Sequence, residues 1–473
     1  MIKRKRNNKG CYIILSILFA LVLFFLQGEQ RVFALSIEEE NRLGQKFLAE
    51  IEQHYELVDD DYANDYINNL GQYLLKSLET KPFTFRFHII KDNELNAFAA
   101  PGGHIFLYTG LIDMMNIDEL AAIICHELGH VSARHLSERI EQGKKIGLAT
   151  LAGILAGSLL GGAAAEALIT GSVAAGVQTQ LNYSRDDERQ ADQLSVKYME
   201  KTGFDAACMI SALTKLQSAS LSGVSNTPPY LLTHPVSTER MANIESMLSV
   251  HKRLGVSEGA DKYRDSYPLF KTILRAKYSD THDVERLFDM ELEKDPDSPL
   301  AHFGLGIILQ ERAEYTGAIE QFQKALKGLP DGIPVLRYLG EAYQQKGQDQ
   351  EAIRVFEKVL KIDDLDKPTL FLLGLSYQNL ENYSRAADIF ERLASMEPVK
   401  DEVFYNLGIS LGRQERLGLA HYYFGVYFKR LHEGQKAEFH FQKALEMSGN
   451  DPSLMKRIRK AQGEGRNGEK EER

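Results

Sequence analysis

The chain has 473 residues, which predicts about three structural units, and its hydrophobic fraction of 44% and charged fraction of 26% are ordinary for a globular protein. Three cysteines exclude a disulfide-stabilised scaffold, and 23 Phe with 21 Tyr exclude disorder throughout the chain. The formal net charge of −10 argues against nucleic acid as the main partner, because there is no excess of basic residues to neutralise phosphates.

The first 34 residues have the features of a cleaved export signal. Basic residues occupy positions 3–6, and an uncharged apolar run of sixteen residues follows at Cys11–Leu26. Val32 and Ala34 stand at positions −3 and −1 of a cleavage site, so we predict cleavage after Ala34 and a secreted mature chain. A membrane span needs about 20 apolar residues, so an uncleaved anchor is the weaker alternative.

The next part of the chain predicts two helices followed by two strands. Ser36 and Glu39 form a capping-box pattern at a helix start, and a second helix is predicted at 61–78. Residues 83–90 alternate with a period of two, which predicts a strand. A second strand is predicted at 104–108, and the proline and glycines before it favour an edge position with its histidine at the surface.

The sequence His-Glu-Leu-Gly-His at 126–130 lies inside a helix-forming run. Residues four apart share one helix face, so His126 and His130 can both reach one Zn²⁺. Glu127 would lie beside the metal, where it can take a proton from the attacking water. The alternative is a pair of solvated histidines that happen to flank a glutamate, and the apolar residues around the motif disfavour it.

A nearly uncharged segment separates this motif from the next one. Between 146 and 177 the only charged residue is Glu166, and Gly153, Gly157 and Gly161 repeat every four residues, a spacing that lets helices approach closely. We expect a helical hairpin packed against the rest of the domain. A pair of membrane spans would need about 40 apolar residues. The functional alternative is a flap that touches the membrane surface or gates the active site.

A third metal ligand is available in the helical segment that begins near Tyr183. A catalytic zinc takes three protein ligands and keeps one open position. Glu188 can supply a carboxylate ligand. Asp192, one helical turn later on the same face, can accept the outer N–H of a ligand histidine and fix its orientation. The neighbouring Asp186 and Asp187 are expected to be solvated.

The second half of the chain, about 265–460, repeats with a period of 34 residues. Three residue types recur at that step: Gly306, Gly340, Gly374 and Gly408; Ala318, Ala352, Ala386 and Ala420; Phe322, Phe356, Phe390 and Phe424. This tetratricopeptide pattern predicts paired helices that stack into an all-α solenoid with a concave groove for peptides or protein segments. Coincidence does not explain three residue types that each recur at the same 34-residue step.

The repeats depart from this period at both ends. Upstream, Phe288 keeps the phase but Thr272 replaces the glycine, which predicts a degenerate first repeat from about 265. Downstream, Gly425 follows Gly408 by 17 residues, which is half a repeat. One helix around 418–431 is therefore expected to serve two consecutive repeats.

Together these motifs resemble the M48 zinc metallopeptidases, in their secreted bacterial form with a tetratricopeptide tail, and within that form the beta-barrel assembly-enhancing protease group. The matching pieces cover nearly all of residues 35–250: Asn96-Ala97-Phe98, Pro101-Gly102-Gly103, Gly110-Leu111, His126 to His130, Arg134-His135, Glu188 with Ala191-Asp192, and Thr233-His234-Pro235 with Glu239-Arg240. The resemblance implies a mainly α fold class. A zincin-like (gluzincin) α+β metallopeptidase domain with a small sheet would precede the tetratricopeptide solenoid.

The resemblance also implies the residues of the active site. It implies one zinc ion per chain, with Glu127 as the general base and three protein ligands, His126, His130 and Glu188. It further implies that the predicted edge strand pairs with an extended substrate by strand addition. The substrate-binding residues would then be Asn96, Ile105, Phe106 and Leu107.

Two residues of the last matching motif keep more than one interpretation. In this family context His234 faces the zinc, either stabilising the oxyanion or occupying the fourth metal position and holding the enzyme latent. A histidine–proline turn without a catalytic role is the plainer alternative. Arg240 binds the oxyanion, anchors this loop, or forms a salt bridge with Glu188 or Asp192. His135 is expected to be structural.

The predicted organisation is a signal peptide at 1–34, a metallopeptidase domain at 35–260 that contains the 146–177 insertion, repeats at 265–460 and a disordered tail at 461–473. The predicted function is a zinc-dependent metalloendopeptidase that hydrolyses peptide bonds of misfolded or stalled envelope and outer-membrane proteins. The resemblance implies a periplasmic location.

The expected partners are unfolded or misassembled envelope proteins, with the outer-membrane assembly machinery contacted through the repeats. The 146–177 insertion would add peripheral membrane contact, and no nucleic acid is expected. The rival hypothesis is a chaperone or adaptor of outer-membrane protein assembly whose protease is latent. A third class, an integral membrane prenyl-protein protease, needs several long spans that the sequence lacks.

Overall fold

The structure is a computed structural model and describes residues 35–142, 183–221, 227–250, 258–279, 281–449 and 451–468. The predicted signal peptide at 1–34 and the apolar insertion at 146–177 lie outside these described residues. Within the described ranges, no helix is both long enough and apolar enough to cross a membrane.

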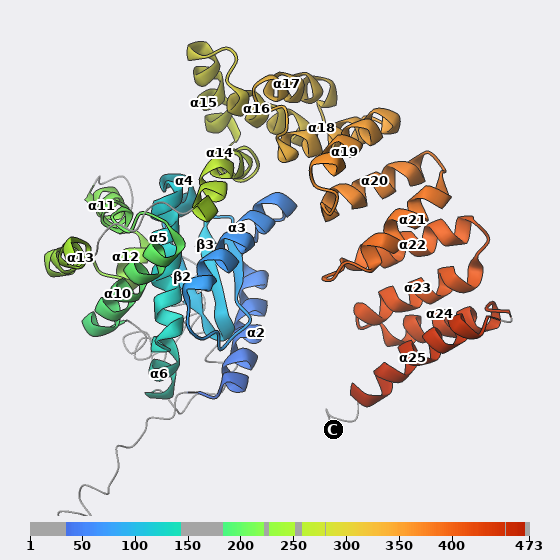
Figure 1. Cartoon of the computed structure of the whole chain (residues 1–473), viewed down its shortest axis with the longest axis horizontal. Coiled ribbons are helices and arrows are strands. Elements are labelled where there is room, and N and C mark those ends of the chain that lie inside the picture. Colours follow the sequence, from blue (N-terminus) through green and yellow to red (C-terminus); the bar gives the residue numbers. More distant parts are fainter. Residues whose placement is uncertain are drawn as a thin grey trace, which may run out of the picture. The chain divides into compact units, whose positions relative to one another are not determined.

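The chain divides into two compact units (Figure 1). Unit 1 consists of Met1–Val58 and Tyr66–Arg264, and unit 2 of Asp59–Asp65 and Asp265–Arg473. Helices predominate in both units, and the strands of the described ranges all belong to unit 1. The predicted mainly α fold class is therefore confirmed, with a small sheet in the first half of the sequence and repeat helices in the second.

Unit 1 combines one small sheet with helices of very different lengths. Its elements are α2 (Ile37–His54), α3 (Asp61–Leu74) from Tyr66 onward, η1 (Leu75–Ser77), β1 (Arg86–Ile90), β2 (Ala97–Ala100), η2 (Pro101–Gly103), β3 (His104–Tyr108), α4 (Thr109–Met114), α5 (Ile117–Ser132), α6 (His135–Gln142), α10 (Arg185–Thr202), α11 (Cys208–Leu221), α12 (Pro229–Thr233) and α13 (Thr238–Val250).

Helix α2 starts where the capping-box pattern predicts. The Ser36 N–H donates to Glu39 Oε2 at 3.0 Å, and the Glu39 N–H donates back to Ser36 Oγ at 3.2 Å. The apolar stripe of this helix is buried, and the ring of Phe47 lies edge-on to Phe98 and Phe106 of the sheet. This packing fixes the sheet on which the candidate site is built.

The sheet has the strand order β1-β3-β2, so β3 is its central strand. β3 pairs in parallel with β1 and antiparallel with β2, and Phe106 lies opposite His88 on one side and Phe98 on the other. The prediction that residues 104–108 form an edge strand is therefore wrong. A central strand has no free edge for a substrate, which removes the basis for the predicted substrate-binding residues Ile105, Phe106 and Leu107, all fully buried.

The proline and glycines that suggested an edge strand belong to the tight turn before β3. The 3-10 turn η2 joins β2 to β3, and its Gly102 and Gly103 have φ values of 76° and 83°, which only glycine adopts readily. His104 follows directly and is buried, so its predicted surface position is also wrong. The strand predicted at 83–90 is shorter in the structure and begins at Arg86.

Unit 2 contains the repeat helices. They are α14 (Glu258–Tyr278) from Asp265 onward, α15 (Thr281–Lys294), α16 (Pro299–Glu311), α17 (Tyr315–Gly328), α18 (Ile333–Gln345), α19 (Asp349–Ile362), α20 (Lys367–Asn379), α21 (Tyr383–Ala394), α22 (Asp401–Arg413), α23 (Leu417–Arg430), α24 (Gly434–Glu446) and α25 (Pro452–Gly468).

Each repeat after the degenerate first one packs a phenylalanine ring onto a glycine sixteen residues earlier. A Cβ atom added at Gly340 would lie 2.3 Å from the ring of Phe356, and one at Gly374 would lie 2.6 Å from the ring of Phe390. A side chain at these positions would overlap the ring, so the glycine column exists because the paired helices cross there. The 34-residue period therefore reflects one repeated contact.

Helix α23 belongs to two repeats, as the half-period step predicts. Its Phe424 packs on Gly408 of α22, and its Gly425 receives the ring of Phe441 from α24. Helix α25 continues to Gly468, into the range 461–473 that was predicted as a tail. Leu454 and Ile458 of α25 are buried against α24, which anchors the helix.

Candidate metal centre

Helix α5 presents the first three residues of the site. A capping box fixes its start: the Glu119 N–H donates to Asn116 Oδ1 at 2.9 Å, and the Asn116 N–H donates to Glu119 Oε2 at 2.8 Å. Most of α5 is buried among apolar residues, and His126, Glu127 and His130 are each at most 1% exposed. Such burial is costly for polar side chains unless they have partners.

Helix α10 brings two acidic residues against α5. A Cβ at Gly129 would lie 2.9 Å from the carbonyl oxygen of Ala191, so glycine permits this close approach. Glu188 and Asp192 follow one another by one turn and both face α5, as the sequence predicts. The two histidines of the motif and the two acids therefore come from two helices in direct contact.

Of the two neighbouring acids, only Asp186 is solvated as predicted. Its side chain is 86% exposed. Asp187 instead caps α10: its N–H donates to Ser184 Oγ at 3.2 Å, its carboxylate accepts from the Ser184 N–H at 2.8 Å, and it also pairs with Arg139. It secures the start of the helix that carries Glu188.

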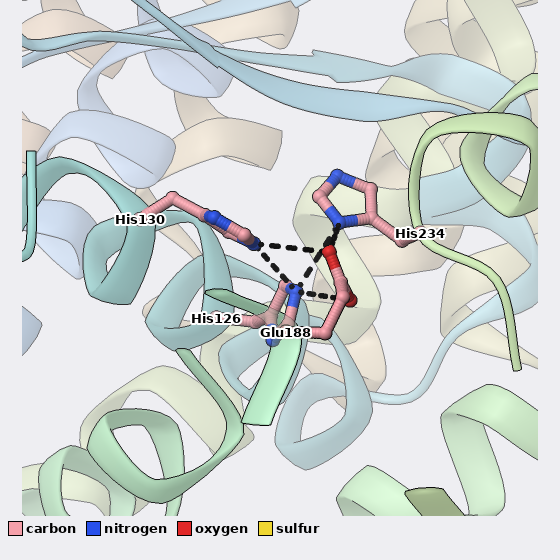
Figure 2. A group of neighbouring side chains, drawn as sticks. All are labelled: His126, His130, Glu188 and His234. Atoms are coloured by element: carbon pink, nitrogen blue, oxygen red, sulfur yellow. Dashed lines mark hydrogen bonds and ion pairs between the residues drawn. The ribbon is translucent and has the colours of Figure 1, made fainter. Parts of the chain in front are cut away.

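Four buried side chains converge at one point, as Figure 2 shows: His126, His130, Glu188 and His234. Their candidate ligand atoms all lie within 4.8 Å of one another. The Nε2 atoms of His126 and His130 are 3.1 Å apart, and His126 Nε2 lies 3.3 Å from His234 Nδ1. Glu188 Oε1 lies 2.8 Å from His234 Nδ1.

These distances fit the donor set of a zinc ion. Two nitrogen ligands at about 2.1 Å from a tetrahedral zinc lie roughly 3.4 Å apart, close to the observed nitrogen separations. Imidazole and carboxylate are the donors that zinc sites use in hydrolytic enzymes. His126, His130 and Glu188 thus occupy the predicted ligand positions, and His234 joins them.

The electrostatics of the group favour a bound cation. Burial alone would raise the pKa of Glu188, but His234, His126 and His130 outweigh it and hold that pKa well below its ordinary value. Burial lowers the pKa of His130 far below its ordinary value, so its imidazole is neutral and available as a ligand. A neutral histidine and an ionised glutamate are the states that metal binding requires.

His126 responds differently because it touches two acids. Burial opposes its protonation, but hydrogen bonds to Asp192 and Glu188 prevail and raise its pKa to about 9. The carboxylates that favour a proton on this imidazole would equally favour a metal ion in the proton's place. Metal binding is therefore expected to release a proton from His126.

Asp192 and Arg240 lie behind the ligands. Asp192 Oδ1 is 3.0 Å from His126 Nδ1, the predicted orienting contact. Arg240 donates to both carboxylate oxygens of Asp192 at 2.8 Å, and its Nη1 lies 2.7 Å from Glu188 Oε2. Arg240 also donates to the His234 carbonyl at 3.4 Å. These contacts agree with two of the predicted roles of Arg240: the salt bridge to Glu188 and Asp192, and the anchoring of the loop that carries His234.

Glu127 lies between strand β2 and the four candidate ligand side chains. Its Oε2 accepts from the Ala99 N–H at 3.0 Å, and its Oε1 is 3.5 Å from His234 Nε2. Burial raises the pKa of this carboxyl, and the charges of His234 and His126 partly offset the rise. The side chain is oriented by a backbone contact and faces the same space as the ligands.

Two tyrosines that sequence analysis missed hold His234. The rings of Tyr183 and Tyr230 stack on its imidazole with centroid distances of 5.2 and 4.6 Å. Both hydroxyls are buried and without a hydrogen-bond partner among the described residues. Tyr230 precedes His234 by four residues, one helical turn, and this spacing was a signal that could have identified it.

The remaining predicted residues lie outside the ligand group. His135 is behind His130, with their Nδ1 atoms 3.0 Å apart, and its Nε2 is 3.0 Å from Gln190 Oε1. Asn96 is buried next to β2, where its carbonyl accepts from the Tyr108 N–H at 3.1 Å. Asn96 therefore helps to join β2 to β3.

Known protein families match both halves of the chain. The profile of peptidase family M48 matches residues 62–248, and tetratricopeptide repeat profiles match 282–333, 334–366 and 371–424. The chain is 29% identical over 306 residues to a putative beta-barrel assembly-enhancing protease of Vibrio cholerae, covering 63% of this chain and 62% of that protein.

Two Escherichia coli K12 proteins are also similar. The chain is 30% identical over 233 residues to the beta-barrel assembly-enhancing protease, covering 48% of each protein. It is 30% identical over 185 residues to the metalloprotease YcaL, covering 39% of this chain and 69% of that one. The chain spans less than two thirds of the two beta-barrel assembly-enhancing proteases.

Proposed function

The chain belongs to peptidase family M48, and we propose that it is a zinc-dependent endopeptidase that hydrolyses peptide bonds of protein substrates. The observation that carries the proposal is the convergence of four buried ligand side chains with Glu127 directly beside them. Zinc is the metal of this family, and the donors fit it. His126, His130 and Glu188 would hold the ion.

A zinc ion in this position supplies Lewis acidity, which makes water a better nucleophile and polarises the scissile carbonyl. Glu127 is placed to hold and move the proton of the reaction. It takes a proton from the attacking water and passes it to the leaving amine. Burial raises the pKa of this carboxyl, which makes it a stronger base toward the proton of the attacking water.

We propose that His234 fills the fourth ligand position in the resting protein and must move before hydrolysis. Its Nδ1 lies among the ligand atoms, and two tyrosine rings and Arg240 hold it there. The alternative role, stabilisation of an oxyanion, requires the same side chain to face the substrate. The rate of the His234→Ala variant distinguishes the two roles.

For substrate binding we propose pairing with β2 in place of β3. The backbone carbonyl of Asn96 bonds to β3, and the direction of the backbone N–H and C=O groups alternates along a strand. The backbone groups of Ala97 and Ala99 therefore point away from β3. The Ala99 N–H already contacts Glu127, so this side of β2 adjoins the catalytic carboxylate. An extended peptide added there would place its backbone next to Glu127.

The proposed clients are misfolded or stalled envelope proteins in the periplasm, bound by the repeats. The support is the likeness to relatives named beta-barrel assembly-enhancing proteases, together with the tetratricopeptide repeats. A second candidate, a chaperone or adaptor of outer-membrane protein assembly with a latent protease, is favoured by the position of His234 in the ligand group.

Cleavage of an unfolded protein such as reduced casein tests the proposed activity. We expect the full chain, or its His234→Ala variant, to cleave casein, to stop with a chelator and to recover with zinc. Glu127→Gln should lose at least a hundredfold of this rate, and the exposed Asp186→Asn should not. Equal rates for Glu127→Gln and Asp186→Asn would exclude the proposed mechanism.

A further inference from the structure

Unit 2 includes a short acidic segment from the first half of the sequence. Residues 59–65 read Asp-Asp-Asp-Tyr-Ala-Asn-Asp, so four of seven residues are acidic and one is aromatic. The first four line a pocket together with residues of α14, of α18 and of the turn before α22. Within unit 2 this segment, whose residues from Asp61 onward form the first turn of α3, packs directly against the repeats.

The acidic side chains of the segment meet specific partners on the repeats. The Tyr338 hydroxyl of α18 donates to Asp60 Oδ2 at 2.5 Å, and Lys277 Nζ lies 3.3 Å from the same oxygen. Lys400 Nζ pairs with Asp61 Oδ1 at 2.5 Å. Asp60 is buried and also accepts from the Ala63 N–H at 2.9 Å, so three partners replace the water that it has lost.

The aromatic residue of the segment has its own contact. Tyr62 packs against the apolar core formed by α14 to α19, and burial raises its pKa to about 12. The repeats thus recognise two features, a pair of neighbouring carboxylates and a ring that follows them. Two separate kinds of contact, one charged and one apolar, are typical of peptide recognition.

The charges around the pocket suit an acidic guest. Arg337 lies in the same pocket, is buried, and pairs with Asp366 at 2.6 Å. Two acids of the repeats oppose the guest: Glu341 also lines the pocket, and Asp366 is among the charges that raise the pKa of Asp65, after burial. Burial raises the pKa of Glu341 to about 7, and Asp60 contributes to this rise. Glu341 can therefore carry a proton at neutral pH, which removes its repulsion of Asp60.

We propose that this face of the repeats is a binding site for acidic peptide segments that contain an aromatic residue, and that Asp59–Asp65 is the chain's own occupant of it. A partner protein would present a segment of the same chemistry and displace the internal one. The internal segment is tethered, so its effective concentration is high and an external peptide competes poorly until the segment is weakened.

The proposal specifies a partner chemistry for the repeats and rests on their proposed role in binding proteins. It is tested by binding alone, so it can fail while the peptidase assignment stands. The probe is a fluorescent peptide with the sequence Asp-Asp-Asp-Tyr-Ala-Asn-Asp, and the comparison peptide carries Asn in place of every Asp. Both are titrated by fluorescence anisotropy into the full chain carrying Glu127→Gln, which prevents cleavage.

Three further variants complete the test. Asp60→Asn with Asp61→Asn weakens the internal segment and leaves the site intact. Lys400→Ala, added to that pair, removes a cation of the site. Lys436→Ala, added instead, is the control, because Lys436 is similarly exposed and its ion pair is with Glu433, at the start of its own helix and outside the proposed site.

We expect the Asp60→Asn/Asp61→Asn chain to bind the acidic peptide at least tenfold more tightly than the chain with its native segment. The asparagine peptide should bind at least tenfold more weakly than the acidic one. Lys400→Ala should reduce the affinity at least threefold, and Lys436→Ala should leave it unchanged.

Two results would overturn the proposal. One is equal binding of the acidic and asparagine peptides; the other is equal affinity with Lys400→Ala and Lys436→Ala. If the doubly substituted chain fails to fold, the native chain is titrated at high peptide concentration instead. The acidic peptide must then bind more tightly than the asparagine peptide, and the absence of that difference would equally refute the site.

Discussion

Replacement of Arg240 by Gln tests whether the acids behind the ligands depend on one buried cation. Arg240 is 7% exposed, makes two bonds of 2.8 Å to Asp192 and lies 2.7 Å from Glu188. Without it, two buried carboxylates lose their compensating charge, and breaking such a pair costs about 3–5 kcal/mol. We expect the metal-free Arg240→Gln chain to lose about that much free energy of unfolding. Because a zinc ion compensates Glu188, the loss should be smaller in the zinc-loaded chain.

The assay is urea unfolding of the chelator-treated and zinc-loaded chains, followed by the fluorescence of the tyrosines. The matched control is Arg189→Gln on the same helix as the acids, since the Arg189 side chain is 44% exposed and pairs with exposed acids. An exposed pair contributes at most about 1 kcal/mol. Equal destabilisation by the two substitutions would refute the reasoning, and so would a loss that zinc does not reduce.

The other predictions concern the fourth ligand, the pH dependence of zinc binding and the repeats. His234→Ala should raise the rate of casein cleavage by the resting protein at least tenfold if His234 occupies the fourth ligand position. A lower rate would assign His234 a catalytic role. Tyr230→Leu should raise the same rate by a smaller factor. Zinc must displace the proton of His126, whose pKa is about 9. The apparent zinc affinity, measured by chelator competition, should therefore fall about tenfold per pH unit below 9, and a flat profile would contradict this. Gly340→Ala would place a Cβ 2.3 Å from the facing phenylalanine and should lower the free energy of unfolding by about 1–3 kcal/mol. Gly434→Ala, with open space around it, should be neutral in the same denaturant titration.

The parts of the fold that follow from short-range spacing could be predicted from the sequence. His126 and His130 share a helix face because they are four residues apart. The repeats can be recognised in the sequence because one glycine–phenylalanine contact recurs at a fixed spacing. Even the shared helix α23 is visible as a half-period step. In each case the physical cause acts within one helix or between two consecutive ones.

The parts that depend on long-range pairing could not be predicted in the same way. The position of β3 is set by its parallel pairing with β1, whereas the local proline and glycines only mark the turn η2. The stacking of Tyr183 on His234 joins residues 51 positions apart in the sequence. Membership of Asp59–Asp65 in unit 2 likewise depends on contacts with Tyr338, far along the chain.

The central claim is that His126, His130 and Glu188 hold a zinc ion, and elemental analysis of the purified full chain tests it most directly. The account predicts about one zinc per chain for the native protein and for Asp186→Asn, whose acid is exposed on the same helix as Glu188. It predicts loss of most of the zinc in His126→Ala and in Glu188→Gln when both remain folded by circular dichroism. Full zinc content in those two folded variants would contradict the account.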